Sequence, residues 1–217
     1  MVRHFYFIVK TLFFQSYINY MIEKSLLEIG AVKLSPQNPF TWTSGIKSPI
    51  YCDNRKLLSY PKVRSEIAKE FANLIQQKFN TCEVIAGVST AGIPWGCLIA
   101  DILDLPFVYV RPTPKVHGMG NQIEGDIQDF KNVVIVEDLI STGISSSKVV
   151  DVLKQQGMNV LGVVSVFDYQ LPVSKQLDIE RYSLGNYKNL CKIAVELNYI
   201  STDMLDSLES WRLSTQI

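Results

Sequence analysis

The chain has 217 residues, enough for one α/β domain with a sizeable core, and its length alone does not require a second domain. Basic and acidic residues number 21 each, so no overall field would recruit nucleic acid or an anionic membrane, and an anionic ligand needs a local site. The four cysteines form no CxxC pair and only two histidines are present, so a reduced protein of the cytoplasm is the simplest interpretation.

Residues 1–20 differ from the rest of the chain. Lys10 interrupts their apolar run, no small-residue cleavage site follows, and the run is shorter than the ~20 residues that a membrane span needs. We expect a dispensable extension. The alternatives are a translation start assigned too far upstream and an apolar helix that packs on a partner. An amphipathic helix is predicted from Met21, with Gly30 as its stop.

Residues 31–60 are rich in turn residues and predict a small aromatic lobe with a short strand at 49–52. A helix is predicted at 61–79, where apolar residues line one face. A buried strand at 84–88 then leads into the small-residue loop Ser89-Thr90-Ala91-Gly92-Ile93 and a helix that runs to Leu103. Such a loop could hold a phosphate, or it could be an ordinary helix start capped by Ser89 or Thr90.

A strand at 107–110 precedes an irregular stretch at 111–125, which holds two prolines and three glycines. The absence of periodicity predicts a long loop rather than a helix or strand, and long loops in compact domains are commonly linkers or lids. Arg111, Lys115 and His117 lie on this loop. Each one alone would be an ordinary solvated group.

The stretch 133–145 organises the rest of the chain. Four aliphatic residues at 133–136 predict a strand buried on both faces, and 147–156 predicts a helix, so 137–145 is interpreted as the turn between them. Glu137 and Asp138 could accept hydrogen bonds from sugar hydroxyls or face a hydrated divalent cation, while the small residues after them leave N–H groups free for a phosphate. The alternative is an ordinary turn with two surface acids and a helix cap at Ser141 or Thr142.

The C-terminal third predicts strands at 160–167 and 181–184, the second at a sheet edge, and helices at 187–197 and 201–213. Ser201, Thr202 and Asp203 are suitable residues for a helix cap. Trp211 is expected to pack between the last two helices rather than on a ligand.

The unbroken string 133–145 resembles the 5-phosphoribosyl 1-diphosphate (PRPP) signature of type I phosphoribosyltransferases. The string 40–55 resembles the hood that covers the base in the orotate-specific branch of that family. The resemblance spans Met21 to about Arg212, and it implies an α/β fold with a central parallel sheet flanked by helices. Residues 21–217 would then form a single domain, with the hood at about 21–60 and a mobile catalytic loop at 111–125.

The resemblance also implies roles for particular residues. Glu137 and Asp138 would lie under the ribose hydroxyls, and Lys47 and Ser141 would contact orotate. The 5′-phosphate would be held by Ser141, Thr142, Gly143, Ile144 and Ser145. The diphosphate would be held by Thr90, Ala91, Arg111, Lys115 and His117, of which the last three would be catalytic.

Further expectations concern partners. Mg²⁺ would be the cofactor, held mainly by substrate oxygens without a metal site made of protein ligands alone. The loop would close over the neighbouring subunit, so a homodimer is expected, with no nucleic-acid or membrane partner.

The sequence departs from the family pattern at three positions. Ala91 and Pro112 stand where some relatives have lysine, and Tyr169 stands where many have an arginine against the orotate carboxylate. Lys47 or Arg55 could take over that last contact. Two alternatives stay open: a phosphoribosyltransferase for another base, and a non-catalytic regulator that senses PRPP.

Overall fold

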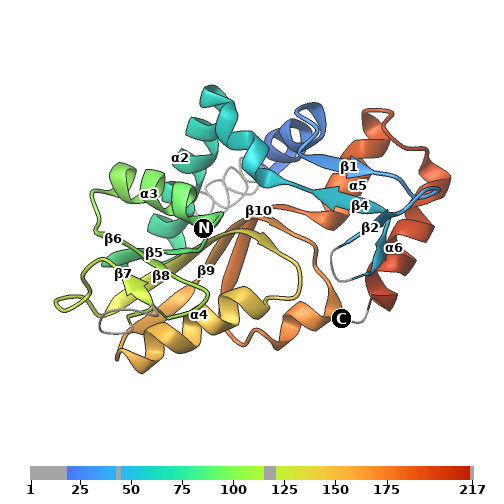
Figure 1. Cartoon of the computed structure of the whole chain (residues 1–217). Helices are drawn as coiled ribbons and strands as arrows, with labels where there is room; N and C mark the ends of the chain where they lie inside the picture. Colours follow the sequence, from blue (N-terminus) through green and yellow to red (C-terminus); the bar gives the residue numbers. More distant parts are fainter. Residues whose placement is uncertain (1–18, 43–44, 115–120, 216–217) are drawn as a thin grey trace, which may run out of the picture.

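A six-stranded sheet forms the centre of the computed structural model, which describes residues 19–42, 45–114 and 121–215 (Figure 1). The strands lie in the order β10-β9-β8-β5-β6-β7, and all neighbours are parallel except β6 and β7. Their bounds are β5 (Val84–Val88), β6 (Phe107–Val110), β7 (Ile123–Glu124), β8 (Asn132–Ile140), β9 (Asn159–Asp168) and β10 (Arg181–Asn186). The predicted α/β fold with a central, mostly parallel sheet is confirmed.

The strand β8 contributes to both hydrophobic cores, because its side chains alternate between the two faces of the sheet. Val134 and Val136 belong to the core beneath α2 (Pro61–Lys78) and α3 (Gly92–Leu103), and Val133 and Ile135 belong to the core beneath α4 (Ile144–Gln155). Figure 1 shows these helices on opposite sides of the sheet. Burial on both faces explains why the strand is almost wholly aliphatic up to Val136.

Two small antiparallel pairs lie within the segment predicted as the hood, β1 (Val32–Leu34) with β4 (Ile50–Cys52) and β2 (Phe40–Thr41) with β3 (Lys47–Ser48), and the name hood is used below for these four strands. A helix at 19–28 precedes it, and η1 (Asn54–Ser59) connects it to α2. The chain ends with η2 (Pro172–Gln176), α5 (Tyr187–Glu196), η3 (Thr202–Met204) and α6 (Leu205–Ser214). Figure 1 shows the hood strands beside α5 and α6.

Aromatic contacts attach the hood to the rest of the domain. The ring of Trp42 lies 5.4 Å from that of Tyr169 and 5.9 Å from that of Trp211, centroid to centroid. Trp211 also contacts Tyr187 of α5 and donates its indole N–H to the backbone oxygen of Lys47 at 2.9 Å. The prediction that Trp211 packs between the last two helices is confirmed, and the same side chain additionally fixes the hood.

Several predicted boundaries were wrong for identifiable reasons. β8 continues to Ile140, because Leu139 and Ile140 pair with Phe167 and Asp168 of β9, so Glu137 and Asp138 lie in the strand and not in a turn. α4 begins at Ile144 rather than at residue 147. The stretch 111–125 is not wholly irregular, since it contains β7.

Differences at the two ends of the chain are smaller. The first helix already includes residues 19 and 20, and Tyr20 packs against the core, so the fold begins before Met21; residues 1–18 lie outside the described part. The last predicted helix begins as η3, and the Ser201 side chain makes no capping bond. Within the described ranges, no helix is both long and apolar enough to span a membrane.

Glu23 is a buried acid on the first helix. It is 1% exposed, and its Oε1 accepts a hydrogen bond from the backbone N–H of Asn186 at 2.9 Å. Its Oε2 has no hydrogen-bond partner within the described residues. Burial raises the pKa of Glu23 to about 8, so the folded chain holds this side chain as the neutral acid near pH 7.

Because the pKa of Glu23 is higher in the folded state, its contribution to stability is complete below about pH 4.5 and declines as the pH rises towards about 8. Glu23→Gln should therefore flatten the pH dependence of stability in this window, by at most about 1.4 kcal/mol per pH unit. Urea unfolding at pH 5, 6.5 and 8 would measure the effect. The exposed Glu66→Gln is the control, and an identical pH profile for both variants would contradict the expectation.

Candidate active site

The loops that follow β5 and β8 lie next to each other at the carboxyl ends of two adjacent parallel strands. This edge of an open α/β sheet is where ligands bind. α3 starts against β8, since a Cβ built on Gly92 would lie 2.3 Å from the backbone oxygen of Val136 and 3.4 Å from the Cα of Glu137. The structure thus brings the predicted diphosphate loop, with Thr90 and Ala91, beside the predicted sugar-binding acids.

Glu137, which is buried, and Asp138, which is half-buried, form an acid pair near the end of β8. Glu137 is 5% exposed, and its Oε1 accepts the backbone N–H of Asp138 at 2.9 Å. Burial and the charge of Asp138 raise the pKa of Glu137 well above its usual range. Burial also raises the pKa of Asp138, and the positive charge of Arg55 partly opposes that shift. Hydroxyl donors or a cation beside this pair would stabilise its ionised form.

The turn between β8 and α4 contains three residues, Ser141, Thr142 and Gly143. Gly143 has φ +81°, a backbone conformation that favours glycine, and its oxygen accepts the N–H of Ser147 at 2.9 Å. The hydroxyl of Thr142 accepts the N–H of Ile144 at 3.3 Å. The first N–H groups of an α-helix have no partner within the helix, so the start of α4 presents hydrogen-bond donors suited to an anion.

The loop after β5 is held by its backbone. The N–H of Ser89 donates to Val110, the N–H of Ile93 donates to Thr90, and the Ser89–Thr90 peptide bond is cis. No side chain caps α3, so the alternative that Ser89 or Thr90 forms an ordinary helix cap is wrong. Thr90 is exposed, and its position beside Glu137 stays compatible with a second phosphate cradle.

Of the three residues predicted to be catalytic, the structure places Arg111, because Lys115 and His117 lie outside the described residues. Its Nη1 lies 3.5 Å from Glu124 Oε1. Its backbone N–H donates to the oxygen of Gln122 at 2.9 Å, and the Gln122 side chain donates back to the oxygen of Arg111 at 2.7 Å. The two ends of the predicted loop are therefore joined at the β6–β7 edge of the sheet.

Two basic residues, one in the hood and one directly after it, make local contacts. Lys47, predicted to contact orotate, donates from Nζ to Thr41 Oγ1 at 2.8 Å. Arg55 donates from Nε to Asp53 Oδ1 at 2.7 Å and lies near enough to Asp138 to affect its pKa. Of the two, Arg55 is the one whose charge acts on the acid pair.

Tyr169, which stands where many relatives have arginine, is a core residue. It is 2% exposed and packs against Phe167 and Trp42. Sequence reasoning gave no role to Asn54, whose side chain donates to the backbone oxygen of Asp138 at 2.7 Å. That contact could not be predicted from local sequence patterns, because 84 positions separate the two residues.

Comparison with known families agrees with this geometry. Residues 54–180, more than half of the chain, match the family model described as the phosphoribosyl transferase domain. The matched segment contains the acid pair, the loop at 89–91 and the turn at 141–143. Fold and site together define a phosphoribosyltransferase.

Curated relatives indicate which branch of the phosphoribosyltransferases the chain belongs to. The chain is 47% identical over 204 residues to the orotate phosphoribosyltransferase of Listeria innocua, covering 92% of this chain and 98% of that protein. It is 49% identical over 199 residues to the enzyme of the same name from Lactococcus lactis, covering 90% and 95%. The crystal structure of orotate phosphoribosyltransferase from Aeropyrum pernix aligns with a TM-score of 0.68 at 28% identity, covering 82% of this chain and 99% of that one. The chain therefore belongs to the orotate phosphoribosyltransferase family, as its resemblance predicted.

The close approach of α3 to β8 should tolerate no side chain at Gly92. Gly92→Ala would place a methyl group against the backbone of Val136, and we expect a loss of about 2–3 kcal/mol in the free energy of unfolding, measured by urea denaturation. Gly157→Ala is the control, because nothing lies within 4 Å there and only its φ of +81° opposes a side chain, at a cost of about 1 kcal/mol. Equal losses for the two variants would contradict this account.

Proposed function

We propose that this chain transfers the 5-phosphoribosyl group of PRPP to orotate, giving orotidine 5′-monophosphate and diphosphate in pyrimidine (UMP) biosynthesis. The supporting observation is the acid pair of β8, a buried Glu137 and a half-buried Asp138, between two small-residue loops that each lead into a helix. The relatives at 47–49% identity are named for this activity and are covered almost completely.

The acid pair and the two loops would each bind a different part of PRPP. Glu137 and Asp138 would accept hydrogen bonds from the ribose hydroxyls, and their ionised forms would be favoured by those donors. The N–H groups at 141–145 would hold the 5′-phosphate at the start of α4. Thr90 and Ala91 would contact the diphosphate, chiefly through backbone donors.

The catalytic loop would act on the leaving group. The bond from C1 of the ribose to a diphosphate oxygen breaks and the oxygen keeps the electron pair, while a ring nitrogen of orotate forms the new bond to C1 and loses its proton to the departing diphosphate or to solvent. Negative charge grows on the diphosphate as this happens, so Arg111 and Lys115 would stabilise the transition state more than the ground state. His117 would donate a hydrogen bond or a proton to the departing group.

Mg²⁺ fits this donor set as a partner of the substrate. Within the described ranges, no group of three His, Cys, Asp or Glu side chains could hold a metal ion. Mg²⁺ commonly keeps several waters and binds through substrate phosphates with one or two carboxylates, which Glu137 and Asp138 could supply. When bound, it would neutralise part of the diphosphate charge.

A homodimer would complete the site. Arg111 follows β6, and β6 lies two strands from β8, roughly 10 Å away in the sheet. The loop starts near the edge of the sheet, from where a stretch of this length could extend to the site of a neighbouring subunit. The four free cysteines fit a reducing compartment such as the cytoplasm.

The acceptor base is the direct test of this proposal. With PRPP and Mg²⁺, diphosphate release should be fast with orotate and at least about 100-fold slower with uracil, adenine or hypoxanthine, because a site that pairs a substrate's polar groups rejects an analogue without them. Comparable release with another base would assign a different acceptor, and no release with any base would favour a PRPP-sensing regulator.

Closure between subunits makes a further prediction. Lys115→Ala and Asp138→Asn should each lower turnover about 100-fold or more, since one removes a cation of the loop and the other a charge of the acid pair. Co-expression of the two should restore about a quarter of the wild-type rate, because half of the dimers would be mixed and each would keep one intact site. Absence of recovery in verified mixed dimers would mean that the loop serves its own subunit.

A further inference from the structure

The acid pair lies on a part of β8 that extends beyond its neighbour. Pairing of β5 with β8 ends at Gly87 and Val136, whereas β8 continues to Ile140. From Glu137 onward, the edge of β8 that faces β5 has no strand partner. Backbone polar groups that are buried away from water need partners, so other parts of the chain must supply them here.

Two side chains take the place of the missing strand. The backbone N–H of Asp138 donates to Glu137 Oε1 at 2.9 Å, and its backbone oxygen accepts from Asn54 Nδ2 at 2.7 Å. Asn54 is 1% exposed and is the first residue of η1, directly after the hood. Both backbone groups of Asp138 are therefore fixed by side chains, and one of these comes from a segment 84 residues away.

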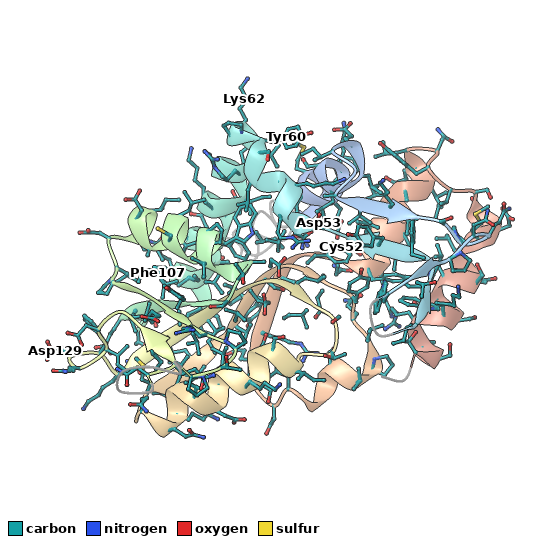
Figure 2. All side chains as sticks on the ribbon, in the orientation of Figure 1. Cys52, Asp53, Tyr60, Lys62, Phe107 and Asp129 are labelled. Atoms are coloured by element: carbon teal, nitrogen blue, oxygen red, sulfur yellow. The ribbon has the colours of Figure 1, made fainter. Side chains whose placement is uncertain are left out.

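The other end of the Asn54 amide is fixed as well. Its Oδ1 accepts a hydrogen bond from the thiol of Cys52 at 3.0 Å, and Cys52 is the last residue of β4 in the hood. Figure 2 shows Cys52 and Asp53 at the place where the hood strand leads into the rest of the chain. A continuous series of hydrogen bonds thus joins Cys52, Asn54, Asp138 and Glu137.

We propose that Asn54 is a positioning residue for the PRPP site: its amide holds the backbone of Asp138 so that the two carboxylates face the ribose, and Cys52 determines which end of the amide faces Asp138. This inference rests on the proposed function. A rotated amide would set its oxygen against the oxygen of Asp138, two acceptors without a hydrogen between them. The thiol of Cys52 opposes that rotation, because it donates to Oδ1.

The thiol remains a donor under ordinary conditions. Burial and the nearby carboxylates of Asp138 and Asp53 raise the pKa of Cys52 well above its usual range, so the S–H is retained near neutral pH. The bond between Asn54 and Asp138 also connects the hood to the sugar site. A shift of the hood would therefore be transmitted to the backbone that carries the acid pair.

Removal of the Asn54 amide is the first test. Asn54→Ala should raise both the KM and the dissociation constant for PRPP about tenfold, because it leaves the oxygen of Asp138 buried without a donor. Asn54→Asp should be worse, since it sets a second acceptor against that oxygen. The KM for orotate should change less than about threefold. Calorimetric binding of PRPP with Mg²⁺, together with steady-state kinetics, separates these quantities.

The matched control is Asn159→Ala. Asn159 donates from Nδ2 to Asn132 Oδ1 at 2.8 Å, a similar amide hydrogen bond at an exposed position at the opposite ends of β8 and β9. Its loss should leave PRPP affinity within about twofold of wild type. Equal effects of Asn54→Ala and Asn159→Ala on PRPP affinity would overturn the proposal.

Variants of Cys52 test the orientation of the amide. Cys52→Ser keeps a donor, so its dissociation constant for PRPP should stay within about threefold of wild type. Cys52→Ala removes the donor and should raise that constant more than about threefold. In the double variant, Cys52→Ala should add nothing to Asn54→Ala, because the two residues act through one series of bonds. Fully additive effects would overturn the role assigned to Cys52.

The outcomes separate this proposal from the proposed function. A wild-type chain that neither binds PRPP nor turns it over with orotate would refute the function. A wild-type chain that does both, while Asn54→Asp binds PRPP equally well, would refute the role of Asn54. Loss of thermal stability in Asn54→Ala with unchanged PRPP affinity would show that the residue only supports the fold.

Discussion

The strand β8 extends four residues beyond the end of its pairing with β5, and the position of the site depends on this extension. The pairing of the two strands ends at Val136, where the aliphatic run of β8 also ends. Up to that residue both faces of the strand are buried in hydrophobic cores. Beyond it, Glu137 and Asp138 extend between the starts of α3 and α4, where backbone donors gather. Two acids and two helix starts are thereby placed together by the register of one sheet.

The same region explains why Glu137 is buried. α3 approaches β8 so closely that only glycine fits at position 92, and η1, which follows the hood, contacts the neighbouring Asp138 through Asn54. Burial raises the pKa of both acids as a result. A substrate that brings hydroxyl donors or a hydrated cation would favour the ionised forms of both carboxylates.

Periodicity predicted the scaffold well and the contacts between distant segments poorly. The apolar runs at 84–88, 107–110 and 160–167 are strands, and those at 84–88 and 160–167 are apolar because both of their faces are buried. The sequence pattern predicts a turn at residues 137 and 138, because polar residues usually end such apolar runs. Pairing of Leu139 and Ile140 with β9 outweighs that tendency and keeps both acids in the strand. The packing of Tyr169 on Trp42 could not be predicted, because the contact depends on the tertiary arrangement of the hood.

The aromatic contacts of the hood have a practical consequence. Of the three tryptophans in the chain, Trp42 and Trp211 lie at the junction of the hood with the body of the domain, whereas Trp95 is fully buried in α3. A change at that junction would therefore alter the surroundings of two of the three emitting side chains, while Trp95 would stay in its buried environment. The protein thus contains its own optical probe of this junction, and rapid-mixing fluorescence could test, without any added label, whether substrate binding changes it.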